Sequence, residues 1–196
     1  MRELFNLTVV LTIICSLAAT ALALVYNITK DPIAYQQRLK KLKAIKAVQP
    51  NYDNEPDQDF VDISLEKNAE GDAGLTRFYL TKKGTDPTGV VFVVTAIGYG
   101  GPIDLMLGLT PDGTITGIQI LKHTETPGLG AKITEKKFLQ QFTAKNAQNT
   151  TWTLKKDGGD IDQISGATIS PQGVVKAISE GLILFSDHHD EILTAG

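Results

Sequence analysis

The sequence has little with which to bind a metal ion or form cross-links. It contains one cysteine, Cys15, and three histidines in 196 residues. A single cysteine excludes an internal disulfide framework and a cluster of cysteines holding zinc or an iron–sulfur centre. The sequence has no excess of positive charge, because its 19 Lys and Arg are outnumbered by 22 Asp and Glu and the pI is about 5.6. We therefore expect no metal site and no nucleic-acid partner.

Charge is missing altogether from a long N-terminal stretch. No charged residue occurs between Glu3 and Lys30, and the 26 residues between them are mostly apolar. As a helix they would span about 39 Å, more than the roughly 30 Å hydrocarbon core of a membrane. Alternatives are a signal peptide cleaved near the Ala-Leu-Ala triplet at 21–23 and a lipoprotein signal ending at Cys15. The apolar run continues past the triplet and a bulky residue precedes the cysteine, so we predict a retained transmembrane anchor over residues 1–29.

A basic segment, residues 30–49, follows the anchor. It carries six Lys or Arg and one Asp, a local charge of +5, and its apolar residues recur at helical spacing. One interpretation is an amphipathic helix lying on anionic lipid headgroups, and the other is a solvated connector that continues the anchor helix. The positive charge would keep the following domain in the cytoplasm, but that rule weakens for long translocated domains. Charge alone leaves the side of the membrane open.

Residues 50–196 have the pattern of one α+β domain. Strand-like runs interleave with helical ones without a regular βαβ alternation. We predict strands over residues 75–83, 90–97 (buried on both faces), 103–109, 114–121 and 151–154. A turn at Pro111–Gly113 joins the third and fourth of these. A short helix is predicted over 135–142 with Thr134 as its N-cap, and a final helix with Ser170 as its N-cap and Pro171 at its first position.

Two short motifs have the composition of ligand-binding loops. The first is Glu125–Gly130 (ETPGLG), a turn after a strand in which two glycines would let the backbone approach a ligand. The second is Asp162–Thr168 (DQISGAT), which gathers hydroxyls and small residues before a helix start, where amides favour a phosphate. The alternatives are an ordinary strand-to-helix turn for the first and a capping loop without a ligand for the second.

Taken together, the motifs resemble the FMN-binding domain of the G subunit of the Rnf-type ion-translocating ferredoxin:NAD oxidoreductase. The C subunit of the sodium-pumping NADH:quinone reductase is its close relative. The resemblance covers nearly the whole chain, and the segments that carry it are TKDPIA at 29–34, VQP at 48–50, GYGGPI at 98–103, HTETPGLG at 123–130 and SGAT at 165–168. It implies one N-terminal transmembrane helix followed by a single FMN-binding domain of mixed sheet and helices.

The resemblance also implies a cofactor and its attachment. In that family FMN is esterified through its phosphate to the Thr that follows Gly-Ala, which is Thr168 here. A separate flavin transferase makes the bond, and Asp162 belongs to the motif that it recognises. Further flavin contacts are expected from Ser165, Gly166, Ala167, Glu125, Thr126, Gly128, Leu129, Gly130 and Tyr99, with Trp152 as a second stacking candidate.

The implied role is electron transfer within a membrane-bound complex that moves sodium ions or protons, together with the other membrane subunits. The flavin domain of the family lies outside the cytoplasmic membrane, on the periplasmic or extracellular side. The chain carries no nicotinamide fingerprint, because its glycines at 98–101 lack the G-x-G-x-x-G spacing. The alternatives are a membrane-anchored FMN carrier or sensor outside such a complex, and the C subunit of the sodium-pumping reductase.

Overall fold

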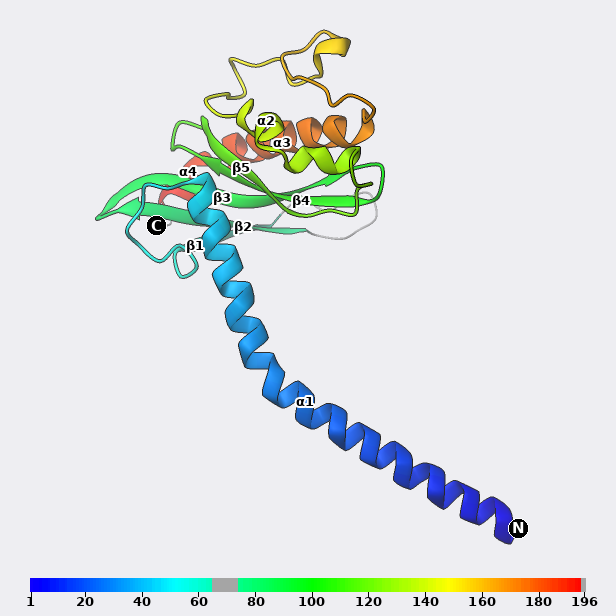
Figure 1. Ribbon diagram of the computed structural model, residues 1–196. Helices are drawn as coiled ribbons and strands as arrows, with labels where there is room; N and C mark the ends of the chain where they lie inside the picture. Colours follow the sequence, from blue (N-terminus) through cyan, green and yellow to red (C-terminus); the bar gives the residue numbers. More distant parts are fainter. Residues whose placement is uncertain (65–73, 195–196) are drawn as a thin grey trace. The chain divides into compact units, whose positions relative to one another are not determined.

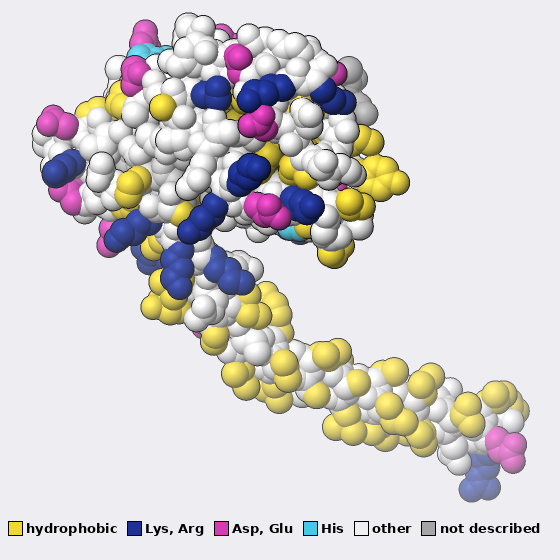
Figure 2. Space-filling model, turned by 45° about the horizontal axis from the view of Figure 1, so that its top comes forward, with side chains coloured by type: hydrophobic (Ala, Val, Ile, Leu, Met, Phe, Trp, Pro, Cys, Tyr) yellow, Lys and Arg dark blue, Asp and Glu magenta, His cyan; other side chains and the backbone are white. Residues whose placement is uncertain are grey.

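The N-terminal unit is a long apolar helix. In the computed structural model, which describes residues 1–64 and 74–194, helix α1 runs from Arg2 to Val48 without interruption. Its most apolar window has a mean hydropathy of 2.4 with none of it buried, so its length and composition suit a membrane span. Figure 2 shows hydrophobic side chains covering this helix on the side in view. The basic segment therefore continues the apolar helix, while its contact with headgroups stays a prediction.

The two compact units of the chain are Met1–Lys41 and Leu42–Gly196, so the last turns of α1 belong to the second unit. The predicted boundaries at residues 29 and 49 remain predictions. The second unit contains one five-stranded antiparallel sheet in the order β1-β2-β3-β4-β5 (Figure 1). The strands are β1 (Phe60–Ser64), β2 (Leu75–Lys83), β3 (Asp86–Ile97), β4 (Pro102–Leu109) and β5 (Ile115–Lys122). The helical elements that follow are η1 (Gly130–Thr134), α2 (Lys136–Gln140), η2 (Lys155–Asp157), α3 (Ile169–Asp187) and α4 (His189–Thr194).

The main core lies between one face of the sheet and helix α3. Phe78, Phe92 and Leu107 on the strands are fully buried with Val174 and Ile178 on the helix. Figure 1 shows α2 and α3 on the same side of the sheet. Burying this apolar surface is the main stabilising contribution expected for a domain of this size. The α+β prediction is confirmed.

A smaller core covers the opposite face of the sheet. Ala44, Ile45 and Val48 from the end of α1 pack with residues of the central strands, Tyr79, Val91 and Met106. Two paired glycines, Gly108 and Gly117, let the backbone approach, because a Cβ on either would lie 3.0–3.2 Å from the carbonyl oxygen of Val48. Strand β3 is buried without a break only from Gly89 to Phe92, so the two-sided burial predicted for residues 90–97 is right for 90–92 and wrong for 93–97.

The local predictions succeed in the sheet and fail around the loops. The turn at Pro111–Gly113 is confirmed, with Gly113 at φ +80° and its amide donating to the Thr110 carbonyl at 3.0 Å. The strand predicted at 151–154 is wrong, since only Leu154 forms an isolated bridge, to Ile161. Thr134 does not cap α2: its hydroxyl donates to the Ala131 carbonyl at 2.9 Å, which closes the preceding 3-10 turn.

Candidate functional site

The two sequence motifs meet at one cavity of about 360 Å³. The cavity lies where the turn after β5 faces the beginning of α3. Most of the predicted flavin contacts line it, together with Ile169 and Ser170 from the first turn of α3. The lining residues are Tyr99, Glu125, Thr126, Leu129, Gly130, Gly166, Ala167, Thr168, Ile169 and Ser170. Residues that are far apart in the sequence thus border the same space.

The first motif folds as a tight turn that leads into η1. The Leu129 and Ala131 amides both donate to the Thr126 carbonyl at 3.2 Å. Gly128 has φ +76° and open space around it, so it serves the backbone conformation of the turn. The turn leaves the Leu129 side chain 45% exposed beside the cavity. The backbone of this motif is therefore a strand-to-helix turn, as the alternative interpretation predicted. The turn also places the apolar Leu129 side chain at the cavity.

The second motif places Thr168 at the start of a helix. The Ala167 amide donates to the Ile164 carbonyl at 3.1 Å, which closes a turn with Ser165 and Gly166 at its centre. Gly166 has φ +79°, a conformation that turns of this kind reserve for glycine. A Cβ at Gly166 would lie 3.2 Å from Leu129 Cδ2, so the motifs approach each other directly. Thr168 follows as the N-cap residue of α3, and its hydroxyl makes no capping hydrogen bond.

The helix start supplies hydrogen-bond donors beside Thr168. The first amides of a helix, here those of Ile169 and Ser170, have no acceptor one turn earlier in the same helix. Pro171 stands at the third helical position, where it lacks an N–H but is tolerated. Together with the helix dipole, these amides favour an anionic group at this end of the helix. The chemistry of the donor set therefore fits a phosphate bonded to the Thr168 oxygen.

Ser170 has a different role from the predicted one. It is not the N-cap of α3 but its second residue, and it is 1% exposed. Its hydroxyl donates to Glu125 Oε2 at 2.6 Å, while Glu125 Oε1 accepts from the Gly100 amide at 3.0 Å. Ser170 therefore lies within the first turn, and Thr168 holds the N-cap position. The Glu125 carboxylate therefore joins the loop after β3, the turn after β5 and the first turn of α3.

Several predicted site residues lie outside this cavity. Asp162 is exposed and forms an ion pair with Lys155 at 2.8 Å. Gln141 holds the backbone of Asp162, because its Oε1 accepts from the Asp162 amide at 2.7 Å. Asp162 and Ser165 both line a neighbouring cavity of about 160 Å³. The Trp152 ring lies parallel to that of Phe142, 6.4 Å between centroids, and does not line the first cavity.

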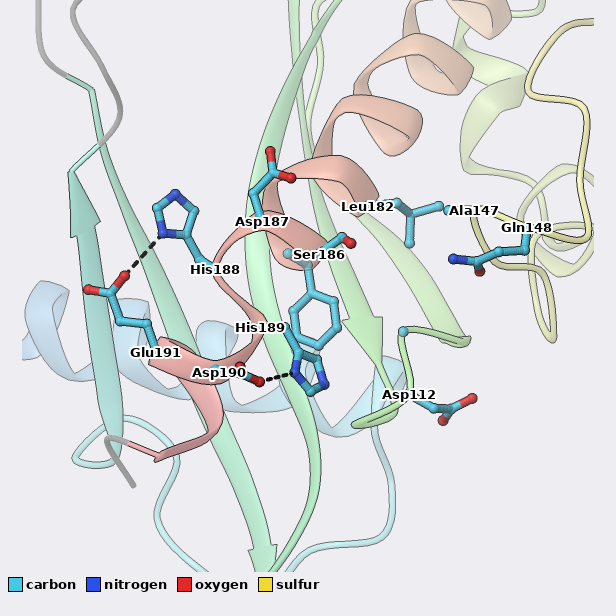
Figure 3. A pocket seen from close by; sticks show the side chains of 12 residues that line it. Asp112, Ala147, Gln148, Leu182, Ser186, Asp187, His188, His189, Asp190 and Glu191 are labelled. Atoms are coloured by element: carbon cyan, nitrogen blue, oxygen red, sulfur yellow. Dashed lines mark hydrogen bonds and ion pairs between the residues drawn. The ribbon is translucent and has the colours of Figure 1, made fainter.

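A cavity of about 390 Å³ lies near the C-terminal end of α3 (Figure 3). Four of its polar side chains form two pairs. His188 contacts Glu191 at 3.1 Å, and His189 lies 2.9 Å from both Asp190 Oδ1 and the Pro111 carbonyl. These hydrogen bonds, that to Asp190 first, raise the pKa of His189 above its usual value. Among residues 1–64 and 74–194, no group of three or more His, Cys, Asp or Glu is placed to hold a metal ion.

Sequence reasoning missed Ile169 and Gly98 as contributors to the site, and it assigned Ser170 only to a helix cap. Ile169 lines the cavity and is 50% exposed, although an isoleucine at a helix start is an ordinary core residue by pattern. Gly98 lies against Glu125 Oε1, so that any Cβ there would collide with the carboxylate. The segment GYGGPI at 98–103 carries part of the family resemblance, but nothing in it indicated that Gly98 makes room for Glu125.

Comparisons with known proteins identify related families. An FMN-binding domain family model matches residues 98–183, and a model of the RnfG N-terminal region matches residues 4–48. The chain is 38% identical over 183 residues to the G subunit of the ion-translocating oxidoreductase complex of Cereibacter sphaeroides, covering 90% of this chain and 81% of that protein. It is 36% identical over 188 residues to the corresponding G subunit of Aliivibrio fischeri, covering 91% and 89%.

Solved structures share the fold. Shewanella oneidensis NqrC matches with a TM-score of 0.52 at 22% identity, over 69% of this chain and 70% of that one. The C subunit of the Na(+)-translocating NADH-quinone reductase of Parabacteroides distasonis matches with a TM-score of 0.59 at 18% identity, over 79% and 95%. At these identities the likeness concerns the fold alone. It supports an antiparallel sheet with helices as the architecture of the domain.

Proposed function

The chain belongs to the family of G subunits of ion-translocating oxidoreductase complexes, and from this premise we propose that it carries electrons through an FMN held covalently as a phosphoester on Thr168. The complex that it serves would be a membrane-bound ferredoxin:NAD oxidoreductase coupled to the movement of sodium ions or protons. Other membrane subunits of that complex would donate electrons to the domain and accept them from it.

The observation that carries this proposal is the position of the Thr168 hydroxyl. It stands at the N-cap of α3, makes no capping bond and opens into the cavity where both motifs meet. The amides of Ile169 and Ser170 begin the helix beside it and suit the charge of a phosphate. A phosphoester at this oxygen would prevent loss of the cofactor by diffusion, which matters for a domain facing the outside of a cell.

The apolar lining suits a flat aromatic ring. Tyr99, Leu129 and Ile169 are 74%, 45% and 50% exposed around the cavity, and all three belong to its wall. Large apolar side chains exposed together mark a binding surface more often than an ordinary exterior. FMN, when bound, supplies reversible electron transfer. The chain's own residues would hold the phosphate at the helix start, cover one part of the ring and keep water from it.

The anchor and the attachment enzyme complete the proposal. Helix α1 would cross the membrane once, with the flavin domain on its periplasmic or extracellular side and the basic residues 30–49 near lipid headgroups or neighbouring subunits. Exposed Asp162 would be recognised by the flavin transferase that esterifies Thr168. A protease is added to intact cells from which the outer layers have been removed. Digestion of the flavin domain would support the periplasmic or extracellular side, and protection of the domain would contradict it.

The test is the attachment itself. The full chain is produced with a flavin transferase, separated on a denaturing gel and examined for flavin fluorescence and for the mass of FMN less water. Thr168→Val keeps the shape of the side chain and removes the hydroxyl, so we expect complete loss of covalent flavin, while Ser165→Ala keeps it. Flavin retained on Thr168→Val would move the ester to another residue. A dark wild-type band, with the transferase active on a control substrate, would overturn the proposal.

Co-purification then defines the context. If the native chain is isolated from membranes with further integral subunits, it works within a complex. If the flavoprotein is isolated alone under mild detergent conditions, a free-standing membrane-anchored carrier or sensor describes it better. The identity of the co-purified subunits separates membership of an Rnf-type complex from membership of a sodium-pumping NADH:quinone reductase.

A further inference from the structure

Glu125 is unusual in the part of the chain that the structure describes. The buried polar residues there are Gln49, Thr81, Glu125, Thr150 and Ser170, so Glu125 is the one acidic or basic residue among them. Its side chain lies at the wall of the candidate flavin cavity and is 5% exposed. Burying a carboxylate is costly unless its oxygens are well bonded, so such a group needs a physical account.

The surroundings are arranged for a charged carboxylate. Each of its oxygens faces a donor, the Gly100 amide on one side and the Ser170 hydroxyl on the other. The 2.6 Å distance to Ser170 lies in the range of hydrogen bonds from a hydroxyl to an ionised oxygen. No Lys, Arg or His forms an ion pair with Glu125 among the residues described. Both oxygens thus face neutral donors, an arrangement that would stabilise a carboxylate without neutralising its charge.

Two glycines complete the pocket that holds the carboxylate. A Cβ at Gly98 would collide with Oε1 and a Cβ at Gly130 with Oε2. Gly130 was predicted to give a ligand access to the backbone, but the space that it leaves is filled by Glu125. The carboxylate therefore occupies a fixed position, shielded from solvent, directly behind the cavity wall.

We propose that Glu125 supplies a fixed negative charge that lowers the midpoint potential of the FMN in this cavity. The proposal rests on the proposed function, because it requires flavin to be bound there. Reducing the flavin adds electrons, and a nearby anion disfavours that addition. Charges in a poorly screened interior act more strongly than surface charges of the same sign. Glu125 would thus be a positioning and tuning residue, which sets how readily the domain passes its electrons on.

The decisive variant removes the charge and keeps the contacts. In Glu125→Gln the amide oxygen can still accept from the Gly100 amide, and the NH₂ group can donate to Ser170, whose hydroxyl can accept as well as donate. The midpoint potential of the covalent flavin is measured by spectroelectrochemical titration of the full chain in detergent. We expect it to become more positive, with the ratio of reduced to oxidised flavin at a fixed potential rising about tenfold.

Two further variants provide a second test and a control. Ser170→Ala removes a donor but leaves the carboxylate, so it should move the potential in the opposite direction, and it decides the matter if Glu125→Gln does not fold. Glu135→Gln removes the same charge from an exposed position on η1–α2, where solvent screens it, and should leave the potential unchanged.

The outcomes separate the two proposals. If the wild-type chain takes up no flavin, the proposed function fails. If flavin is attached through Thr168 but Glu125→Gln and Glu135→Gln have the same potential as the wild type, the function stands and the role of Glu125 is overturned. The role of Glu125 is also contradicted if Ser170→Ala leaves the midpoint potential of the flavin unchanged or raises it.

Discussion

Two cavities of similar volume, about 360 Å³ at the start of α3 and about 390 Å³ near its end, have opposite chemistry. Exposed apolar side chains, two threonines and one serine are among the residues that line the first, and its carboxylate is hydrogen-bonded to Ser170 and to the Gly100 amide. The second is lined mainly by polar side chains, among which His188 pairs with Glu191 and His189 with Asp190 (Figure 3). Volume does not distinguish them. What distinguishes them is the lining: the large apolar side chains at the first, Tyr99, Leu129 and Ile169, are exposed, whereas those at the second, Leu182 and Phe185, are buried.

Because the linings differ, we expect substitutions in the two cavities to have different effects. In the first, the proposed flavin site and the fold depend on the same atoms, because Glu125 joins three segments of the fold and also lines the cavity. In the second, the paired residues hold the short helix α4 near the β4–β5 turn, through His189 and the Pro111 carbonyl. Substitutions in the first cavity should therefore change stability and flavin together. Substitutions in the second should change stability alone.

The largest effect is expected for Gly130→Ala. Its new methyl group would collide with Glu125 Oε2 and lie 2.7 Å from the Ser170 hydroxyl, both buried. Overpacking of this kind costs about 1–3 kcal/mol, and displacing the carboxylate from its donors adds to that cost. We expect a lower unfolding midpoint in urea and loss of flavin attachment in the gel assay.

Gly128→Ala is the matched control for that variant. Gly128 belongs to the same turn, but a Cβ there meets nothing within 4 Å and only the backbone at φ +76° is strained. The expected cost is about 1 kcal/mol with attachment retained. Equal stability of Gly130→Ala and the wild type would show that the carboxylate does not occupy this position.

A smaller effect separates two isoleucines of α3. Ile169 and Ile183 are similarly exposed, at 50% and 55%, but only Ile169 lines the first cavity. Truncating either to Ala should cost less than about 1 kcal/mol, since each is already half in solvent. Ile169→Ala should make the attached flavin more accessible to quenching by iodide, and Ile183→Ala should not. Identical quenching in both variants would place the flavin ring away from Ile169.

The same contrast explains what the sequence could predict. Alternation and turn chemistry are local, and they identified four of the five strands and the turn around Asp112, whose side chain accepts from the Thr114 hydroxyl at 2.7 Å. Strand β1 has only five residues and was missed. The segment 151–154 has strand composition, but it has no partner strand beyond a single bridge and so does not form one.

The candidate site was predictable where its residues form contiguous motifs. Both motifs were recognised, and they line one cavity. What could not be predicted were contacts between them, since Glu125 and Ser170 are 45 positions apart. A Ser before Pro at a helix start has the pattern of an N-cap, and only the tertiary structure shows its hydroxyl directed to Glu125. Likewise, nothing local shows that Gly98 and Gly130 make room for one buried carboxylate.

The smallest effect tests the second cavity through pH. His189 lies between two acceptors, Asp190 and the Pro111 carbonyl, and only the protonated ring donates to both. Its pKa is raised in the folded protein, chiefly by the hydrogen bond to Asp190. The extra stability is therefore fully present below the ordinary His pKa of about 6.5 and is lost as the pH rises through the raised value.

His189→Gln should accordingly be less stable than the wild type at about pH 5.5, and the difference should shrink by about pH 8.5. Because the side chain is 42% exposed, solvent screening keeps the pH-dependent part below about 1 kcal/mol. Thermal unfolding of both proteins across this range measures it, and the flavin signal should stay constant throughout. A stability difference that grows with pH would show that the neutral ring is the bound form, and a change in flavin attachment would mean that the two cavities are not independent.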